Sequence, residues 1–128
     1  LVVRENGIRL RHLRLTVFAV PYGAAPCVSG LRVFGRGNGE RPQAARAAAK
    51  RIGPMDFTVS VPRVPGAAGF NVLWGHRPDK LYHSYMLMGD SVSEKRIGAL
   101  VAGQTYYFRV DAFNENGITA GEVERLGG

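Results

Sequence analysis

Most of the chain after residue 55 alternates apolar and polar residues in short runs, and turn-forming residues separate these runs. In FNVLWG, residues 70–75, the alternation places Phe70, Val72 and Trp74 on one face, since successive side chains of a strand point to opposite sides. Short strands at this regular spacing, with no alternation between strands and helices, predict an all-β sandwich. The predicted strands and the closing hairpin are FTVSV (57–61), FNVLWG (70–75), LYHSYMLMG (81–89), EKRIGAL (94–100) and YYFRVDAFNENGITAG (106–121).

A separate alternating pattern lies near the N-terminus. Residues 8–20, IRLRHLRLTVFAV, change parity near His12, where a bulge would bring both apolar sets onto one face. Residues 28–35, VSGLRVFG, predict a second strand, so we expect an extra two-strand fragment before the main sandwich. The run GRGNGERP, residues 35–42, contains turn-forming and charged residues and predicts a linker or boundary.

The run QAARAAAKRI, residues 43–52, fits two structures. Alanine has the highest intrinsic helix propensity, Pro42 suits a first helical turn and Gly53 suits a helix end. A helix of this length is marginal in water, however, and the run stands directly before a series of strands. A short helix and a thin strand therefore remain alternatives here.

The stretch LVAGQTYYFRVDAFNENG, residues 100–117, resembles the corner and following strand of a fibronectin type III domain. The matching positions are Leu100, Gly103, Tyr106, Phe108, Val110, Ala112, Asn114 and Gly117. Two positions depart from the family pattern, because Ala102 replaces a proline and Val61 stands where a tryptophan is usual. The resemblance implies an immunoglobulin-like (fibronectin type III) β-sandwich in which Tyr106 is the structural corner tyrosine, buried and hydrogen-bonded to nearby backbone.

A narrower resemblance concerns GFNVLWGHRPDKLYHSYM and YYFRVDAFNENGIT. These stretches are similar to the fibronectin-like C-terminal domain of bacterial family 43 glycoside hydrolases, and VSGLRVFG is similar to the end of a discoidin-like (galactose-binding-like) β-sandwich. The resemblance implies a discoidin-like remnant at 1–37, a linker at 38–42 and a fibronectin type III-like domain at 43–128. It also implies a non-catalytic accessory or spacer module of a secreted, periplasmic or cell-surface enzyme, whose catalytic domain would be its partner.

The length and the charge of the chain limit the classes of protein to which it could belong. No apolar run of the 128 residues approaches the roughly 20 that a membrane helix needs, so we expect no membrane span. The absence of an initiator methionine before Leu1 suggests a piece of a longer polypeptide. The net charge of +7 raises polyanion binding through Arg9, Arg11 and Arg14, but the scattered basic residues argue against a nucleic-acid partner.

The candidate chemistry is sparse. Most acidic residues fall in predicted turns or on outward strand faces, where surface charge is the simpler interpretation, so we expect no catalytic residues. Neither CxxC nor HxxxH occurs, which argues against a metal site, and no motif indicates a cofactor. The single cysteine, Cys27, is expected to be a small buried apolar residue.

Aromatic residues form the best candidate for a binding site. A carbohydrate-binding surface could use Trp74, His76, Tyr82, His83 and Tyr85. Packing within the sandwich is the competing interpretation, favoured because Trp74 alternates with the apolar residues of its strand. A protein–protein interaction module is a further alternative.

Two features of the sequence are expected to need contact partners. The outward face of the closing hairpin carries Arg109 and Asp111, which could pair with each other, and Phe113, for which a neighbouring domain is the expected contact. The N-terminal fragment would leave unpaired strand edges, so it should pack on the sandwich or support strand-mediated self-association.

Overall fold

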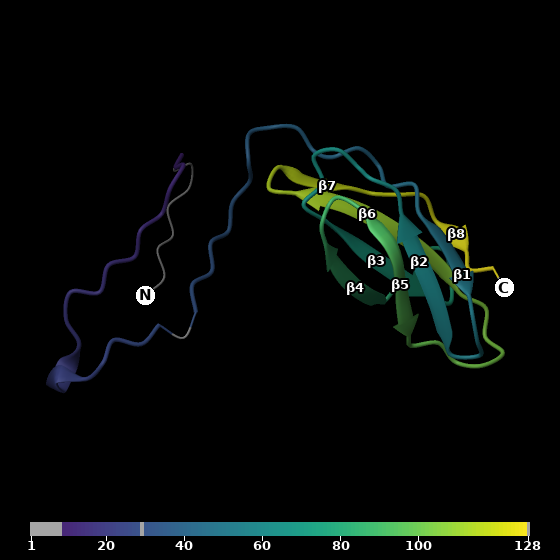
Figure 1. The fold of residues 1–128 in the computed structure, drawn as a ribbon, viewed down its shortest axis with the longest axis horizontal. Coiled ribbons are helices and arrows are strands. Elements are labelled where there is room, and N and C mark those ends of the chain that lie inside the picture. The colour runs from purple at the N-terminus through teal and green to yellow at the C-terminus, as the bar shows by residue number, and fades with distance from the viewer. Residues whose placement is uncertain (1–8, 29, 128) are drawn as a thin grey trace. The chain divides into compact units, whose positions relative to one another are not determined.

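The computed structural model describes residues 9–28 and 30–127, and the chain divides into two compact units, Leu1–Phe34 and Gly35–Gly128. Every strand found in the described residues lies in the second unit (Figure 1). They are β1 (Ala48–Arg51), β2 (Asp56–Val61), β3 (Gly69–Gly75), β4 (His83–Met88), β5 (Val92–Gly98), β6 (Tyr107–Asn114), β7 (Gly117–Thr119) and β8 (Glu124–Arg125).

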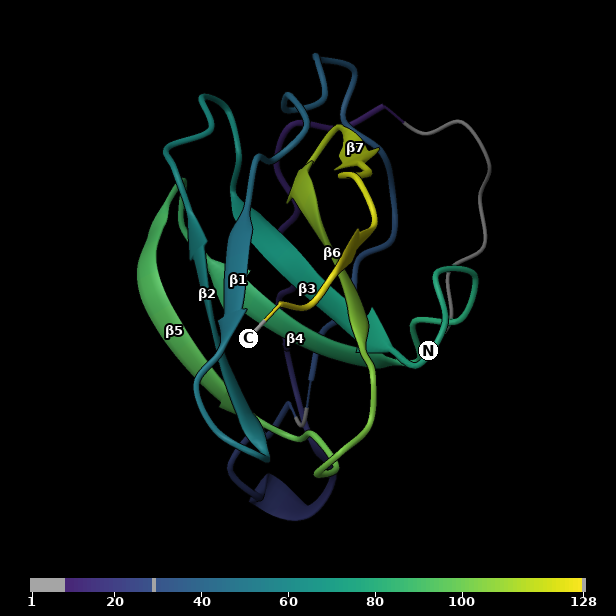
Figure 2. The ribbon, with the colours of Figure 1, turned by 90° about the vertical axis from the view of Figure 1, so that its right-hand side faces the viewer.

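Two antiparallel sheets form the second unit. One has the strand order β1-β2-β5 and the other the order β4-β3-β6-β7, with β8 also paired to β6. Figure 2 shows the two sheets facing each other, with β1, β2 and β5 in one layer. The architecture is an immunoglobulin-like β-sandwich, which confirms the predicted fold class.

The core lies between the two sheets and contains the apolar residues that the alternation placed on one face. Phe57, Val59 and Val61 of β2 face Phe70 and other residues of the second sheet, and all are buried. Val61 thus fills the position at which the fibronectin pattern usually has a tryptophan, and the chain's single tryptophan packs from β3 instead. The complete buried apolar set is Ala45, Phe57, Val59, Val61, Val64, Phe70, Val72, Trp74, Ile97, Leu100, Tyr106, Phe108, Val110, Ala112 and Leu126.

The ambiguous alanine-rich run is a strand. Ala48–Arg51 pairs antiparallel with Phe57–Ser60, and Ala45 just before it is buried in the core. The Arg51 side chain donates hydrogen bonds to the backbone carbonyls of Gly53, Pro54, Val101 and Gln104. These tertiary contacts require an extended backbone, so they override the modest helix propensity of alanine.

The C-terminal segment joins the two sheets. The Leu126 N–H donates to the Tyr106 carbonyl at 2.8 Å, and the Arg51 N–H donates to the Gly127 carbonyl at 2.7 Å. Figure 2 shows this yellow segment running between β1 and β6. Together with the buried Leu126 side chain, these bonds close the sandwich at this end.

The first unit differs from the predicted two-strand fragment. Its described residues, 9–28 and 30–34, contain the short 3-10 turn Pro21–Gly23 but no strand, and Ile8 and Ser29 lie outside them. Leu10, Leu13 and Leu15 remain 53–55% exposed, and Cys27, expected to be buried, is exposed as well. An alternating pattern stabilises a strand only where a second strand and an apolar layer receive it. The domain bounds and the discoidin-like assignment remain predictions.

Candidate functional site

The predicted corner residue lies directly before β6. Tyr106 is buried, and its hydroxyl accepts a hydrogen bond from the Val101 N–H, five residues upstream, at 3.0 Å. The ring of His76 lies 4.3 Å from the Tyr106 ring, between centroids, and its Nδ1 is 3.3 Å from the Thr105 carbonyl oxygen. His76, a predicted sugar contact, therefore covers the corner.

Trp74 belongs to the core. It is 4% exposed, packs edge-on against Phe57 at 5.5 Å and stacks on the His83 ring at 5.4 Å. Its Nε1 has no hydrogen-bond partner within the described residues. A buried ring presents no face on which a sugar could stack, so Trp74 fits the packing interpretation.

The remaining aromatic residues are accessible but do not form one flat surface. Tyr82 is 64% exposed and stands perpendicular to the His83 ring, while one face of His83 is covered by Trp74. Tyr85 lies beside the Lys95 ammonium, with Nζ 5.3 Å from the ring centroid. Sugar binding through Tyr82, His83 and Tyr85 thus remains a prediction, with two separate tyrosine rings as its main surface.

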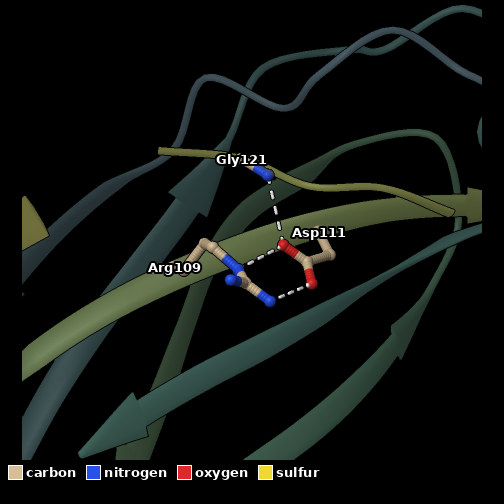
Figure 3. A network of polar contacts seen from close by, with 3 residues as sticks. All are labelled: Arg109, Asp111 and Gly121. Carbon is tan, nitrogen blue, oxygen red and sulfur yellow. Dashed lines mark hydrogen bonds and ion pairs between the residues drawn. The ribbon is translucent and has the colours of Figure 1, made fainter. Parts of the chain in front are cut away.

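The outward face of β6 carries a charge pair whose aspartate is buried and whose arginine is partly exposed. Arg109 donates to both carboxylate oxygens of Asp111, from Nε at 2.7 Å and from Nη2 at 2.9 Å, as the parity of the strand predicted. Figure 3 shows a third bond that the pattern did not reveal, from the Gly121 N–H to Asp111 Oδ1 at 3.1 Å. A Cβ atom at position 121 would collide with the Val110 carbonyl oxygen, so only glycine allows this close approach.

Phe113 packs against Gly69 of the neighbouring strand in the same sheet. Its ring lies over Gly69, where a Cβ atom would come within 2.5 Å of Phe113 Cζ. The missing side chain of the glycine leaves room for the ring, and Phe113 is half-buried without a neighbouring domain.

The predicted linker is bonded to the turn between β6 and β7. The Gly37 N–H donates to the Glu115 carbonyl at 2.7 Å, and the Gly39 N–H donates to Asn116 Oδ1 at 2.9 Å. In return, Asn116 Nδ2 donates to the Glu40 carbonyl at 2.9 Å. The linker and the turn thus exchange hydrogen bonds in both directions.

Further contacts extend this attachment toward β1. Asn114 Nδ2 also donates to the Glu40 carbonyl, at 3.0 Å, and the Thr119 hydroxyl donates to the carbonyl of the buried Pro42 at 2.6 Å. A side chain at Gly37 would collide with Asn116 Oδ1. We call this set, residues 37–42 with Asn114–Thr119, the junction.

The described residues offer little for catalysis or metal binding. Each aspartate of the chain is paired with an arginine, in the pairs Asp56–Arg96, Asp79–Arg77, Asp90–Arg63 and Asp111–Arg109. Across residues 9–28 and 30–127, no group of three His, Cys, Asp or Glu side chains could hold a metal ion. The described part of the chain also has no helix that could cross a membrane.

Comparisons with known proteins found similarity to solved structures. No family model and no curated protein matches the chain. Among solved structures, the solution structure of the fn3 domain of human collagen alpha-1(XX) chain is similar at 19% sequence identity and a TM-score of 0.45, covering 77% of this chain and 88% of that one. The two sheets, their strand order and the tyrosine corner make the second unit a fibronectin type III-like β-sandwich.

Proposed function

We propose that this chain is a non-catalytic accessory module that holds a domain on its N-terminal side at a fixed angle to the sandwich. The observation that carries the proposal is the junction. A flexible tether would expose its backbone to water, whereas residues 37–42 are bonded to the Asn114–Thr119 hairpin at both ends. These bonds hold the backbone of residues 37–42 against the sandwich.

The parent polypeptide in this proposal is a secreted bacterial carbohydrate-active enzyme. The support is the resemblance of residues 69–86 and 106–119 to the C-terminal domain of family 43 glycoside hydrolases. A rigid module without an active site suits a role beside a catalytic domain, because it fixes geometry without competing for substrate. Export to the periplasm, the cell surface or the medium is part of the same proposal.

Backbone ¹⁵N relaxation of the whole chain tests the fixed angle. The amides of Gly37–Arg41 should have order parameters near those of rigid strands, about 0.85, and Asn116→Ala should lower them below about 0.6. Asn116 supplies bonds to both Gly39 and Glu40, so its loss removes two of the five hydrogen bonds of the junction, those in the middle of the linker, and leaves the core intact. Glu115→Ala is the matched control, since only its backbone contacts the linker. Low order parameters in the unaltered chain would refute the positioning role.

A second candidate, carbohydrate binding, is supported by the 64% exposure of Tyr82, which directly precedes β4, the edge strand of the second sheet. Affinity electrophoresis in gels that contain arabinoxylan, xylan or galactan separates the two functions. A spacer should migrate as in a gel without polysaccharide. Retardation that Tyr82→Ala and Tyr85→Ala abolish would establish the sugar-binding role, and unchanged migration on every polysaccharide would eliminate it.

A further inference from the structure

One edge of the second sheet is open and uncharged. β4 pairs with β3 on one side, and no strand of the described residues pairs with it on the other. The stretch that contains β4, LYHSYMLMG (81–89), has no lysine, arginine, aspartate or glutamate, although the whole chain has a net charge of +7. An uncharged strand at the end of a sheet is a template to which another strand can add.

The other sheet edges are charged, short or covered. β5 contains Glu94, Lys95 and Arg96 in succession. β1 is bonded to the C-terminal segment through the Arg51 N–H and the Gly127 carbonyl, and β7 has three residues and lies in the junction. Charges, short strands and covering segments prevent edges from pairing with other chains. Within the part of the chain that the structure describes, β4 lacks all three.

The backbone groups of alternate β4 residues point to the open side. The Gly89 N–H donates to the Ala68 carbonyl at 2.9 Å, so it points toward the β3 side. Because the N–H and C=O of one peptide group point in opposite directions, the Met88 carbonyl points away from β3. This direction repeats every two residues along a strand, so the backbone groups of Ser84 and Met86 also point to the open side.

Apolar side chains accompany these open backbone groups. Met86 and Met88 are 62% and 68% exposed. They lie on the outward face of the sheet, since Leu87 between them pairs with the core residue Phe70. Methionine is flexible and apolar, so it packs readily against a surface that has the same character. The edge therefore offers both hydrogen bonds and apolar area to a partner.

A second copy of the chain matches this edge. An antiparallel pair with a two-fold axis at Met86 sets this residue opposite its own counterpart and sets Ser84 opposite Met88. All three residues whose backbone groups point outward then exchange hydrogen bonds with the same three residues of the other copy. No other antiparallel register of two identical strands uses all three.

The charge distribution also suits a second copy. Two chains of net charge +7 repel each other, so they approach most easily where neither carries charge, as along residues 81–89. In the antiparallel pair, Lys80 of each copy lies toward the end where Asp90 of the other copy follows the stretch. Asp90 is paired with Arg63, and this pair has no net charge. The flanks of the contact therefore do not set two uncompensated cations against each other.

We propose that β4 is a self-association edge, along which two copies of the chain pair antiparallel with the two-fold axis at Met86. The second sheets of the two copies then form one continuous sheet, and Met86 and Met88 of both copies cover one another on its outward face. This inference does not depend on the spacer role, because the junction lies beside β7, at the opposite edge of the same sheet.

Sedimentation velocity of the whole chain, from micromolar to millimolar concentration, tests the proposal, and the dimer fraction should rise with concentration. Met86→Lys sets two like charges opposite each other and should weaken dimerisation at least about tenfold. The matched control is Met55→Lys, the same change at an exposed methionine between β1 and β2, and it should alter dimerisation by less than about twofold. An equimolar mixture of Met86→Lys and Met86→Glu chains should restore dimerisation, because opposite charges then meet at the axis.

Hydrogen exchange measured by NMR identifies the strand that pairs. The amides of Ser84, Met86 and Met88 should exchange quickly in dilute protein and slowly in the dimer, because pairing removes them from water.

Four results would overturn the proposal. A chain that sediments as a monomer at millimolar concentration does not self-associate through this edge. Equal weakening by Met86→Lys and Met55→Lys would mean that net charge, and not β4, controls association. Dimerisation without slower exchange of the three amides would place the contact elsewhere in the chain. If the mixture of lysine and glutamate variants stayed monomeric, the two-fold axis would not lie at Met86.

Discussion

The chain contains the spacing Arg-x-Asp twice, in the turn after β3 and in the middle of β6. Arg77 contacts Asp79 at 3.0 and 3.2 Å, and Arg109 contacts Asp111 at 2.7 and 2.9 Å, so both pairs are bidentate. Their surroundings differ. The turn pair has side chains 63% and 58% exposed, whereas those of the β6 pair are 32% and 8% exposed.

A short distance between two ions therefore does not by itself determine how much the pair stabilises the fold. An exposed pair gains little because water solvates both ions almost as well when they are apart. A buried carboxylate has lost that water and depends on the contacts that replace it, here Arg109 and the Gly121 N–H. The β6 pair therefore holds the segment around Gly121 against the sheet, whereas the exposed Arg77–Asp79 pair contributes little to stability.

The largest expected effect comes from removing the buried carboxylate. Asp111→Ala leaves Arg109 and the Gly121 N–H without their acceptor, and should lower the free energy of unfolding by about 2–3 kcal/mol. Asp79→Ala, the matched change in the turn, should alter it by less than about 0.5 kcal/mol. Urea denaturation of both variants gives the two values. Equal losses would show that burial does not distinguish the pairs.

A smaller effect should follow when only the hydrogen bond from the Gly121 N–H to Asp111 is disturbed. The Cβ atom of Gly121→Ala would collide with the Val110 carbonyl oxygen, so the segment must move away from Asp111. We expect a loss of about 1–2 kcal/mol in the free energy of unfolding. In Gly53→Ala the added atom has ordinary contact at 3.8 Å with Asp56, and it should be close to neutral. A neutral Gly121→Ala would mean that the Arg109 contact suffices by itself.

Sequence reasoning predicted those parts of the fold that depend on local spacing. Alternation located β2 through β6, and the distance from Leu100 to Tyr106 predicted the corner, because both patterns describe positions within a few residues of each other. The Arg109–Asp111 pairing followed from the same parity. In each case the partner residues lie near one another in the chain.

Contacts between distant segments could not be predicted in this way. Nothing in the residues around Asp111 indicates that Gly121 returns to it, or that Asn116 binds a linker more than 75 residues upstream. The alanine run was ambiguous because its strand structure depends on pairing with β2 and on the bonds of Arg51. The predicted sugar site included Trp74 for a related reason. The burial of Trp74 depends on packing against Phe57 of the opposite sheet, which the residues around Trp74 do not indicate.

The smallest expected effect concerns a third pair, Arg63–Asp90, whose 2.7 Å contact is as short as that of the buried pair but exposed. The hydrogen bond from Arg63 lowers the pKa of Asp90 below 3.8. Because this pKa is lower in the folded protein than in the unfolded chain, the pair stabilises the fold above the unfolded pKa, and this contribution is lost as the pH falls through the folded pKa. Arg63→Gln should return the pKa of Asp90 toward 3.8 in a carboxyl ¹³C NMR titration and reduce stability only slightly near neutral pH. The difference from the unaltered protein should vanish at the acid end of the titration. A loss as large as that of Asp111→Ala would show that contact distance, rather than burial, decides what an arginine–aspartate pair contributes in this sandwich.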